Sequence, residues 1–122
     1  MLKVSVLALI ALLPGNAMAA NFYGTEYGCW RNALDAHNGK SSTPRPGGPS
    51  ILLDSEGVEL ITETCEFPDG SKFDGKPIEA QCYAPGFDTG TPTTFAFGPT
   101  GKAGELQMIN EAGTTLLHLC TP

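Results

Sequence analysis

Four widely spaced cysteines, Cys29, Cys65, Cys82 and Cys120, are the residues of this chain with the clearest chemical potential. No Cys-x-x-Cys occurs, and even the closest two, Cys65 and Cys82, stand seventeen positions apart. This spacing fits neither a catalytic dithiol nor a zinc site. An even number of cysteines in a small exported protein is typical of structural disulfides. We therefore expect two disulfides, and no metal or other cofactor at these positions.

The strand register around residues 68–77 favours one of the three possible pairings. This segment (PDGSKFDGKP) is rich in turn residues, and if the strands on either side form a hairpin, Cys65 lies opposite Cys82. Directly opposed residues bring their Cα atoms to about 4.5 Å, within the reach of a disulfide. Cys29 then pairs with Cys120 and joins the beginning of the domain to its end.

The first nineteen residues indicate where those cysteines are sent. Lys3 precedes an apolar stretch from Val4 to Leu13, Pro14-Gly15 ends the stretch, and Ala17-Met18-Ala19 is a small-x-small cleavage site. This is the layout of a secretory signal peptide, too short to span a bilayer, which needs roughly 20 apolar residues. We expect cleavage after Ala19 or Ala20, and export to a bacterial periplasm or the extracellular medium. A retained N-terminal anchor is the alternative.

Residues 20–122 then form a single small acidic domain. The chain has 13 Asp and Glu against 7 Lys and Arg, a net charge of −6, and losing Lys3 makes the domain one unit more negative. Such a charge does not suit nucleic acid or anionic lipid. It would attract a basic partner, although an acidic surface also simply keeps a protein soluble. The core of so small a domain is thin. Each disulfide would stabilise the domain by about 3–5 kcal/mol, because it lowers the entropy of the unfolded chain.

Short apolar runs between glycines and prolines predict an antiparallel all-β fold, a barrel or sandwich of five to seven strands. The expected strands are Ile51–Leu53, Val58–Phe67, Ile78–Tyr83, Thr93–Phe97, Glu105–Ile109 and Thr114–Cys120. The alternation is cleanest along Ile78–Tyr83, which predicts a half-buried strand. Within Val58–Phe67 it changes phase at Leu60-Ile61, which we interpret as a bulge.

Residues 26–37 are the exception and predict a short N-terminal helix. Four side chains fall at i, i+3, i+4 and i+7, one stripe of a helix: Trp30, Ala33, Leu34 and His37. Gly39 is a natural residue to end it. Because Gly28 is a poor helix former, a first strand over Tyr27–Trp30 is the alternative. Residues 40–49, with three prolines and two glycines, follow as a surface loop, either a connector or a recognition arm.

A carboxylate-rich stretch, residues 54–66, is the candidate for catalysis, and it contains Asp54, Glu56, Glu59, Glu63 and Glu66. Paired carboxylates about 5–9 Å apart can hydrolyse glycosidic bonds. Glu59 and Glu63 would share a face of an extended strand. A solvated strand face explains the same residues without any catalysis.

Three weaker signals have structural explanations. Residues 69–75 resemble a calcium loop, but Phe73 occupies the third ligand position and a tight hairpin loop explains the sequence. His37 at a helix end interacts with the helix dipole, and His118 lies in an apolar strand. The aromatic cluster before the loop, Phe22, Tyr23, Tyr27 and Trp30, forms either a recognition patch or a plug for one end of the core.

These observations favour an exported, non-enzymatic binding module that acts on a protein or another envelope component, for example an inhibitor of an extracellular hydrolase. We expect no nucleic-acid partner and no membrane insertion after cleavage. The alternatives are a small extracellular hydrolase that uses the acidic residues of 54–66, and a purely structural envelope protein.

Overall fold

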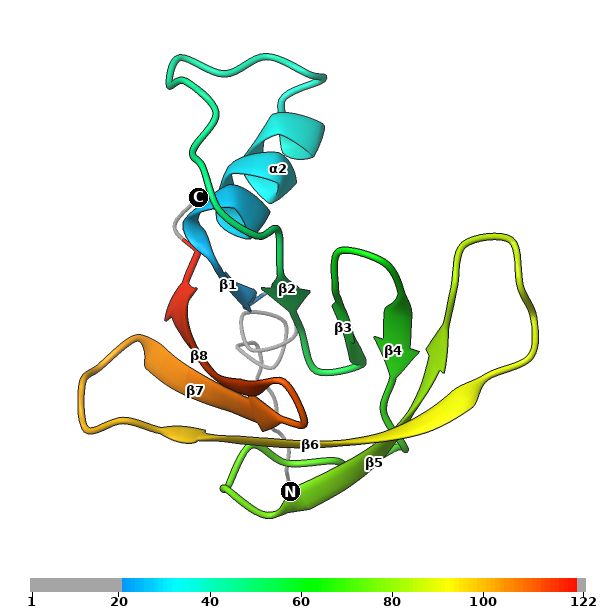
Figure 1. Cartoon of the computed structure of the whole chain (residues 1–122). Coiled ribbons are helices and arrows are strands. Elements are labelled where there is room, and N and C mark those ends of the chain that lie inside the picture. The colour runs from blue at the N-terminus through cyan, green and yellow to red at the C-terminus, as the bar shows by residue number, and fades with distance from the viewer. Residues whose placement is uncertain (1–20, 121–122) are drawn as a thin grey trace, which may run out of the picture.

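The computed structural model describes residues 21–120, which form a closed barrel of eight antiparallel strands with one helix at its side (Figure 1). The elements are β1 (Tyr23–Gly24), α2 (Glu26–Ala36), β2 (Leu52–Leu53), β3 (Gly57–Glu59), β4 (Thr64–Glu66), β5 (Pro77–Tyr83), β6 (Thr91–Pro99), β7 (Glu105–Asn110) and β8 (Gly113–Leu119). Each strand pairs with the next along the chain, and β8 closes the barrel on β1. The expected mostly-β fold with one short helix is confirmed, although the strand count exceeds the five to seven predicted. The expected signal peptide lies outside the described residues.

Two strands are additional to the six expected ranges. One is β1, and the other arises because the expected strand over 58–67 is a hairpin. β3 and β4 pair antiparallel, with Val58 opposite Cys65, and the turn between them is closed by the amide of Leu60 donating to the carbonyl of Glu63 at 2.8 Å. The phase change at Leu60-Ile61 is therefore a reversal of chain direction, and the interpretation as a bulge was wrong. Two three-residue strands joined by four residues have too few positions for the alternation to distinguish a turn from a bulge.

The remaining strands follow the predicted pattern. Buried and exposed residues alternate along β5, from exposed Pro77 to buried Cys82. The last three strands form a meander, since β6 pairs with β7 and β7 pairs with β8. Within residues 21–120, no helix is long and apolar enough to cross a membrane.

Four phenylalanines dominate the barrel interior. Phe95 and Phe97 are fully buried on β6 and their rings stack with centroids 5.8 Å apart. Phe67 and Phe73, from the connection between β4 and β5, pack against Phe97 at 5.5 Å and 5.1 Å. Because the ring of Phe73 packs against the core, the connection between β4 and β5 is held close to the barrel.

The helix is positioned by a close backbone contact. Gly28 is the one buried residue of α2, and a Cβ atom built on it falls well within 3.0 Å of the carbonyl oxygen of Ile51. A Cβ on Gly24, four residues earlier, would lie 2.5 Å from the same oxygen. Only glycine at both positions lets α2 approach the start of β2 this closely.

The predicted helix over residues 26–37 is therefore confirmed, and the alternative strand over Tyr27–Trp30 was wrong. The face buried against the barrel is that of Gly28 rather than the predicted stripe. The helix ends with Asn38 in the left-handed region (φ 58°), followed by Gly39 (φ 80°), so that Asn38 takes the place expected for glycine.

Two disulfides are present, and one of them joins the cysteines that the strand register places opposite each other. Cys65 and Cys82 lie directly opposite each other on β4 and β5, with Cα atoms 3.9 Å apart, and both are in the core. Cys29 on α2 is bonded to Cys120, just after β8, with Cα atoms 5.2 Å apart. Two disulfides suit an oxidising environment.

Candidate binding groove

A groove with a volume of about 710 Å³ separates α2 and its following loop from the end of β8. One wall belongs to the helix and contains Cys29, Trp30 and Ala33. The loop forms the second side with Ser41, Thr43, Pro44 and Pro46. The third side is the end of β8 and the residue after it, with His118, Leu119 and Cys120. Apolar surfaces therefore line the groove, while hydroxyl, imidazole and Glu26 carboxylate groups stand among them.

Aromatic and arginine side chains hold the loop over the helix. The indole Nε1 of Trp30 donates to the carbonyl of Thr43 at 3.1 Å, and Arg45 lies over the ring of Tyr27 at 5.7 Å. Tyr27 and Trp30 meet edge to face, with centroids 5.9 Å apart. These contacts keep a proline-rich segment in place although it has no regular secondary structure, and so they define the second side of the groove.

Thr25 fixes the base of both the helix and the loop. Its hydroxyl oxygen accepts from the amide of Gly28 at 3.1 Å, which caps the helix, and from the amide of Ile51 at 3.1 Å. The same hydroxyl donates to the carbonyl of Pro49 at 2.6 Å. One side chain thus joins the helix start to the point where the loop returns to the barrel.

The β8 side of the groove is also held by named contacts. Nδ1 of His118 lies 3.9 Å from a carboxylate oxygen of Glu105 on β7, and the hydroxyl of Thr100 makes a short hydrogen bond to the other oxygen of that carboxylate. The amide of Cys120 donates to the carbonyl of Phe22 at 2.8 Å. His118 is exposed and its ring lines the groove.

The aromatic cluster predicted from the sequence divides between two roles. Tyr23 packs against the barrel core, as a plug would. Tyr27 and Trp30 instead hold the loop, and Trp30 lines the groove. Phe22 lines a separate cleft of about 230 Å³ beside β3 and β4.

Four of the five residues of the acidic stretch line the cleft of about 230 Å³ beside β3 and β4: Asp54, Glu56, Glu59 and Glu66. Asp54 caps its own turn, since its Oδ1 accepts from the amides of Glu56 and Gly57 at 2.8 Å and 3.0 Å. Glu59 ends β3 and Glu63 lies in the turn that follows, so the expectation that they share a strand face was wrong. Glu63 does approach the sulfur atoms of Cys65 and Cys82, but these are bonded to each other and therefore cannot ligate a metal.

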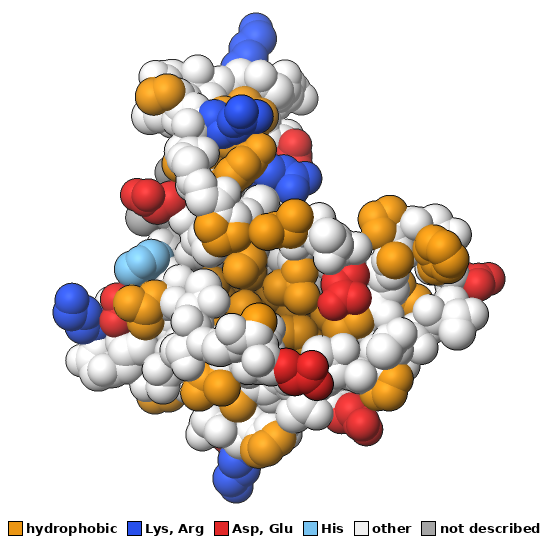
Figure 2. All heavy atoms as spheres, in the orientation of Figure 1, with side chains coloured by type: hydrophobic (Ala, Val, Ile, Leu, Met, Phe, Trp, Pro, Cys, Tyr) orange, Lys and Arg blue, Asp and Glu red, His pale blue; other side chains and the backbone are white. Residues whose placement is uncertain are grey.

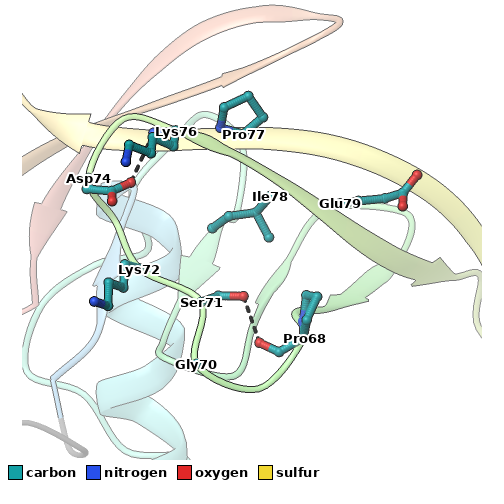
Figure 3. Close-up of a pocket in the computed structure, with 9 residues that line it drawn as sticks. All are labelled: Pro68, Gly70, Ser71, Lys72, Asp74, Lys76, Pro77, Ile78 and Glu79. Carbon is teal, nitrogen blue, oxygen red and sulfur yellow. Dashed lines mark hydrogen bonds between the residues drawn. The ribbon is translucent and has the colours of Figure 1, made fainter.

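The loop that resembles a calcium site forms a shallow hollow of about 320 Å³ (Figure 3). The hydroxyl of Ser71 is used within the loop, donating to the carbonyl of Pro68 at 2.7 Å, and Oδ1 of Asp74 accepts from the amide of Lys76. In Figure 3, Lys72 and Glu79 point away from each other. The polar groups of this loop therefore satisfy its own turns instead of converging on one point.

Charge is unevenly divided between the two parts of the molecule. Residues 21–50, which include α2 and its loop, carry three basic and two acidic side chains, whereas residues 51–120 carry three basic and eleven acidic ones. Figure 2 shows basic side chains on the lobe formed by α2 and the loop, and carboxylates spread over the barrel. In the same view, hydrophobic side chains gather between that lobe and the strands beneath it. The groove thus lies between a lobe with a formal net charge of +1 and a barrel with a formal net charge of −8.

Sequence reasoning found Trp30 but not the groove, because its other sides come from residues that are distant in the chain. The proline-rich loop was interpreted mainly as a connector, and the β8 side is contributed by residues more than seventy positions later. The only feature of the sequence that pointed toward a binding site was Trp30, followed within twenty residues by the prolines of the loop. Comparison of the chain with protein-family models, with curated proteins and with solved structures finds no match.

Proposed function

We propose that this protein is an exported, non-enzymatic binding module whose groove beside Trp30 receives an apolar side chain of a basic protein partner. The observation that carries this proposal is the groove itself. Its volume of about 710 Å³ lies within the range of small binding sites, roughly 300–1,000 Å³, and its lining combines an aromatic ring and prolines with a few polar groups. An inhibitor of an extracellular hydrolase is one class of module that would use such a surface.

Charge supports the choice of a basic partner. The eleven acidic side chains of residues 51–120 give the barrel a negative field, which would speed encounter with a positively charged protein. Trp is among the residues that contribute most at protein interfaces, and here its ring is already held by a hydrogen bond. Little side-chain entropy would then be lost on binding.

Affinity capture with the oxidised protein tests the proposal, provided that groove variants are compared in parallel. Ala33→Arg places a long charged side chain in the groove, whereas Ala36→Arg adds the same charge at an exposed position of the same helix that does not line it. We expect one stoichiometric partner that is retained by Ala36→Arg, lost by Ala33→Arg, and bound less tightly as salt concentration rises.

Two results would contradict the proposal. Equal capture by both arginine variants would place the binding surface elsewhere. If capture of the partner does not weaken as salt concentration rises, the partner is not attracted by the acidic side chains.

A further inference from the structure

The groove lies across one of the three junctions of the barrel at which neighbouring strands pair at only two positions, the others being β1–β2 and β2–β3. β1 is two residues long and pairs with β8 at only two positions, Tyr23 with Leu119 and Gly24 with His118. By contrast, β7 and β8 pair at six positions. The helix and loop follow β1, while the third side of the groove belongs to β8 and Cys120. The sides of the groove therefore stand on opposite sides of this junction.

A single covalent bond joins those two sides. The Cys29–Cys120 disulfide connects α2 to the residue after β8, and both of its sulfur-bearing residues line the groove. Beyond the two strand pairings, the contacts across the junction include the Cys120 amide donating to Phe22 at 2.8 Å, and the Cys29 sulfur lying 3.8 Å from the carbonyl oxygen of His118. Loss of the bond would leave a short strand as the main connection.

The two disulfides differ in their access to solvent. Cys29 and Cys120 are partly exposed at the groove, whereas Cys65 and Cys82 are 0% and 2% exposed inside the barrel. Thiol–disulfide exchange requires a thiolate to approach a sulfur atom in line with the bond, so a soluble reagent can reach the first bridge without unfolding the protein. It can reach the second only when the barrel opens.

We propose that the Cys29–Cys120 disulfide is a redox switch. In the oxidised protein it holds the helix side and the β8 side of the groove together, and its reduction by an external dithiol lets the two sides separate. The thiolate of the dithiol attacks one sulfur of the bridge, the S–S bond breaks, and the released cysteine takes up a proton. The second thiol of the reagent then displaces the other cysteine and forms the reagent's own disulfide. Two electrons and two protons pass to the protein, and the Cys65–Cys82 bond is retained. The effect on partner binding rests on the proposed function.

Graded reduction of the wild-type protein with dithiothreitol, followed by alkylation and peptide mass mapping, tests the order of reduction. We expect Cys29 and Cys120 to be alkylated at least ten times faster than Cys65 and Cys82. Equal rates, or earlier labelling of the buried pair, would overturn the switch.

Amide hydrogen exchange of the selectively reduced protein tests whether the junction opens. The Cys120 amide, which donates to Phe22, should exchange at least ten times faster than in the oxidised protein, while amides between β5 and β6 keep their protection. Unchanged exchange at Cys120 would overturn the proposal, because the junction would not have opened. Global loss of protection would also overturn it, because the disulfide would then stabilise the whole fold and not control one junction. A Cys29→Ser and Cys120→Ser double variant should reproduce the reduced state.

Binding of the captured partner separates this inference from the proposed function. If reduction opens the junction but the oxidised protein binds no partner, the binding function fails and the switch stands. If the oxidised protein binds its partner and selective reduction leaves the affinity unchanged, the groove is not controlled by the bridge and the switch is overturned.

Discussion

Replacing Gly28 by alanine tests how the helix is placed, because helix propensity and packing predict opposite signs. In the middle of a helix, alanine is about 1 kcal/mol more favourable than glycine. At this position, however, the added methyl carbon falls well within 3.0 Å of the carbonyl oxygen of Ile51, a separation that Cβ atoms do not adopt. The helix must then move away from β2.

The size of the effect follows from these two contributions. Overpacking of this kind costs about 1–3 kcal/mol, and the gain in helix propensity offsets about 1 kcal/mol of it. Movement of α2 also weakens the hydrogen bonds that Thr25 makes to Gly28 and Ile51. We therefore expect Gly28→Ala to lower the free energy of unfolding by about 1–2 kcal/mol, which corresponds to a fall in Tm of several degrees, about 4–8 °C per kcal/mol.

Urea denaturation of the oxidised protein, with Gly47→Ala as the matched control, measures the change. Gly47 lies in the loop, a Cβ on it would meet no atom within 4 Å, and its φ is not in the left-handed region. This control should leave stability unchanged or raise it by about 0.4–1 kcal/mol. If Gly28→Ala stabilises the protein as well, the helix does not rest on the Ile51 carbonyl and the packing described here is wrong.

Three further substitutions have defined outcomes. Thr25→Val removes the hydroxyl that makes three hydrogen bonds and should cost about 1–3 kcal/mol in urea denaturation, whereas Thr25→Ser should cost much less; equal losses would contradict the assigned role. Trp30→Phe removes the indole hydrogen bond to the loop, so trypsin should cleave after Lys40 faster than in the wild type; an unchanged rate would show that the loop is held otherwise. Phe97→Ala should destabilise by about 3–5 kcal/mol because its ring is fully buried, whereas Phe87→Ala, at a residue that is 70% exposed, should stay within about 0.5 kcal/mol.

The sequence predicted the parts of the fold in which buried and exposed residues repeat at a regular spacing. Along β5, each inward side chain alternates with an outward one, so Ile78 and Cys82 are assigned to the core by their positions alone. The same alternation sets the register that places Cys65 opposite Cys82. These features depend only on residues close together in the sequence, so they can be predicted without knowing the rest of the structure.

The parts that could not be predicted depend on close approach between distant segments. Gly28 weakens the helix pattern in the sequence, yet it is the residue that lets the helix pack against Ile51. That role follows from a backbone contact with a residue more than twenty positions away, which periodicity does not report. The groove is similar, because Trp30, Pro44 and Leu119 meet only after the barrel has closed.

The pairing of β1 with β8 also determines the order of events during folding. The disulfide that spans this junction links residues 91 positions apart, and closing so long a loop must precede any gain from the contacts it brings together. Until Leu119 reaches Tyr23, β1 and β8 both have an unpaired edge, which can pair with another chain instead. A chain interrupted before its last strand would therefore be an open, aggregation-prone sheet. Barrel closure must wait until β8 is available, which places the final step of folding after synthesis of that strand.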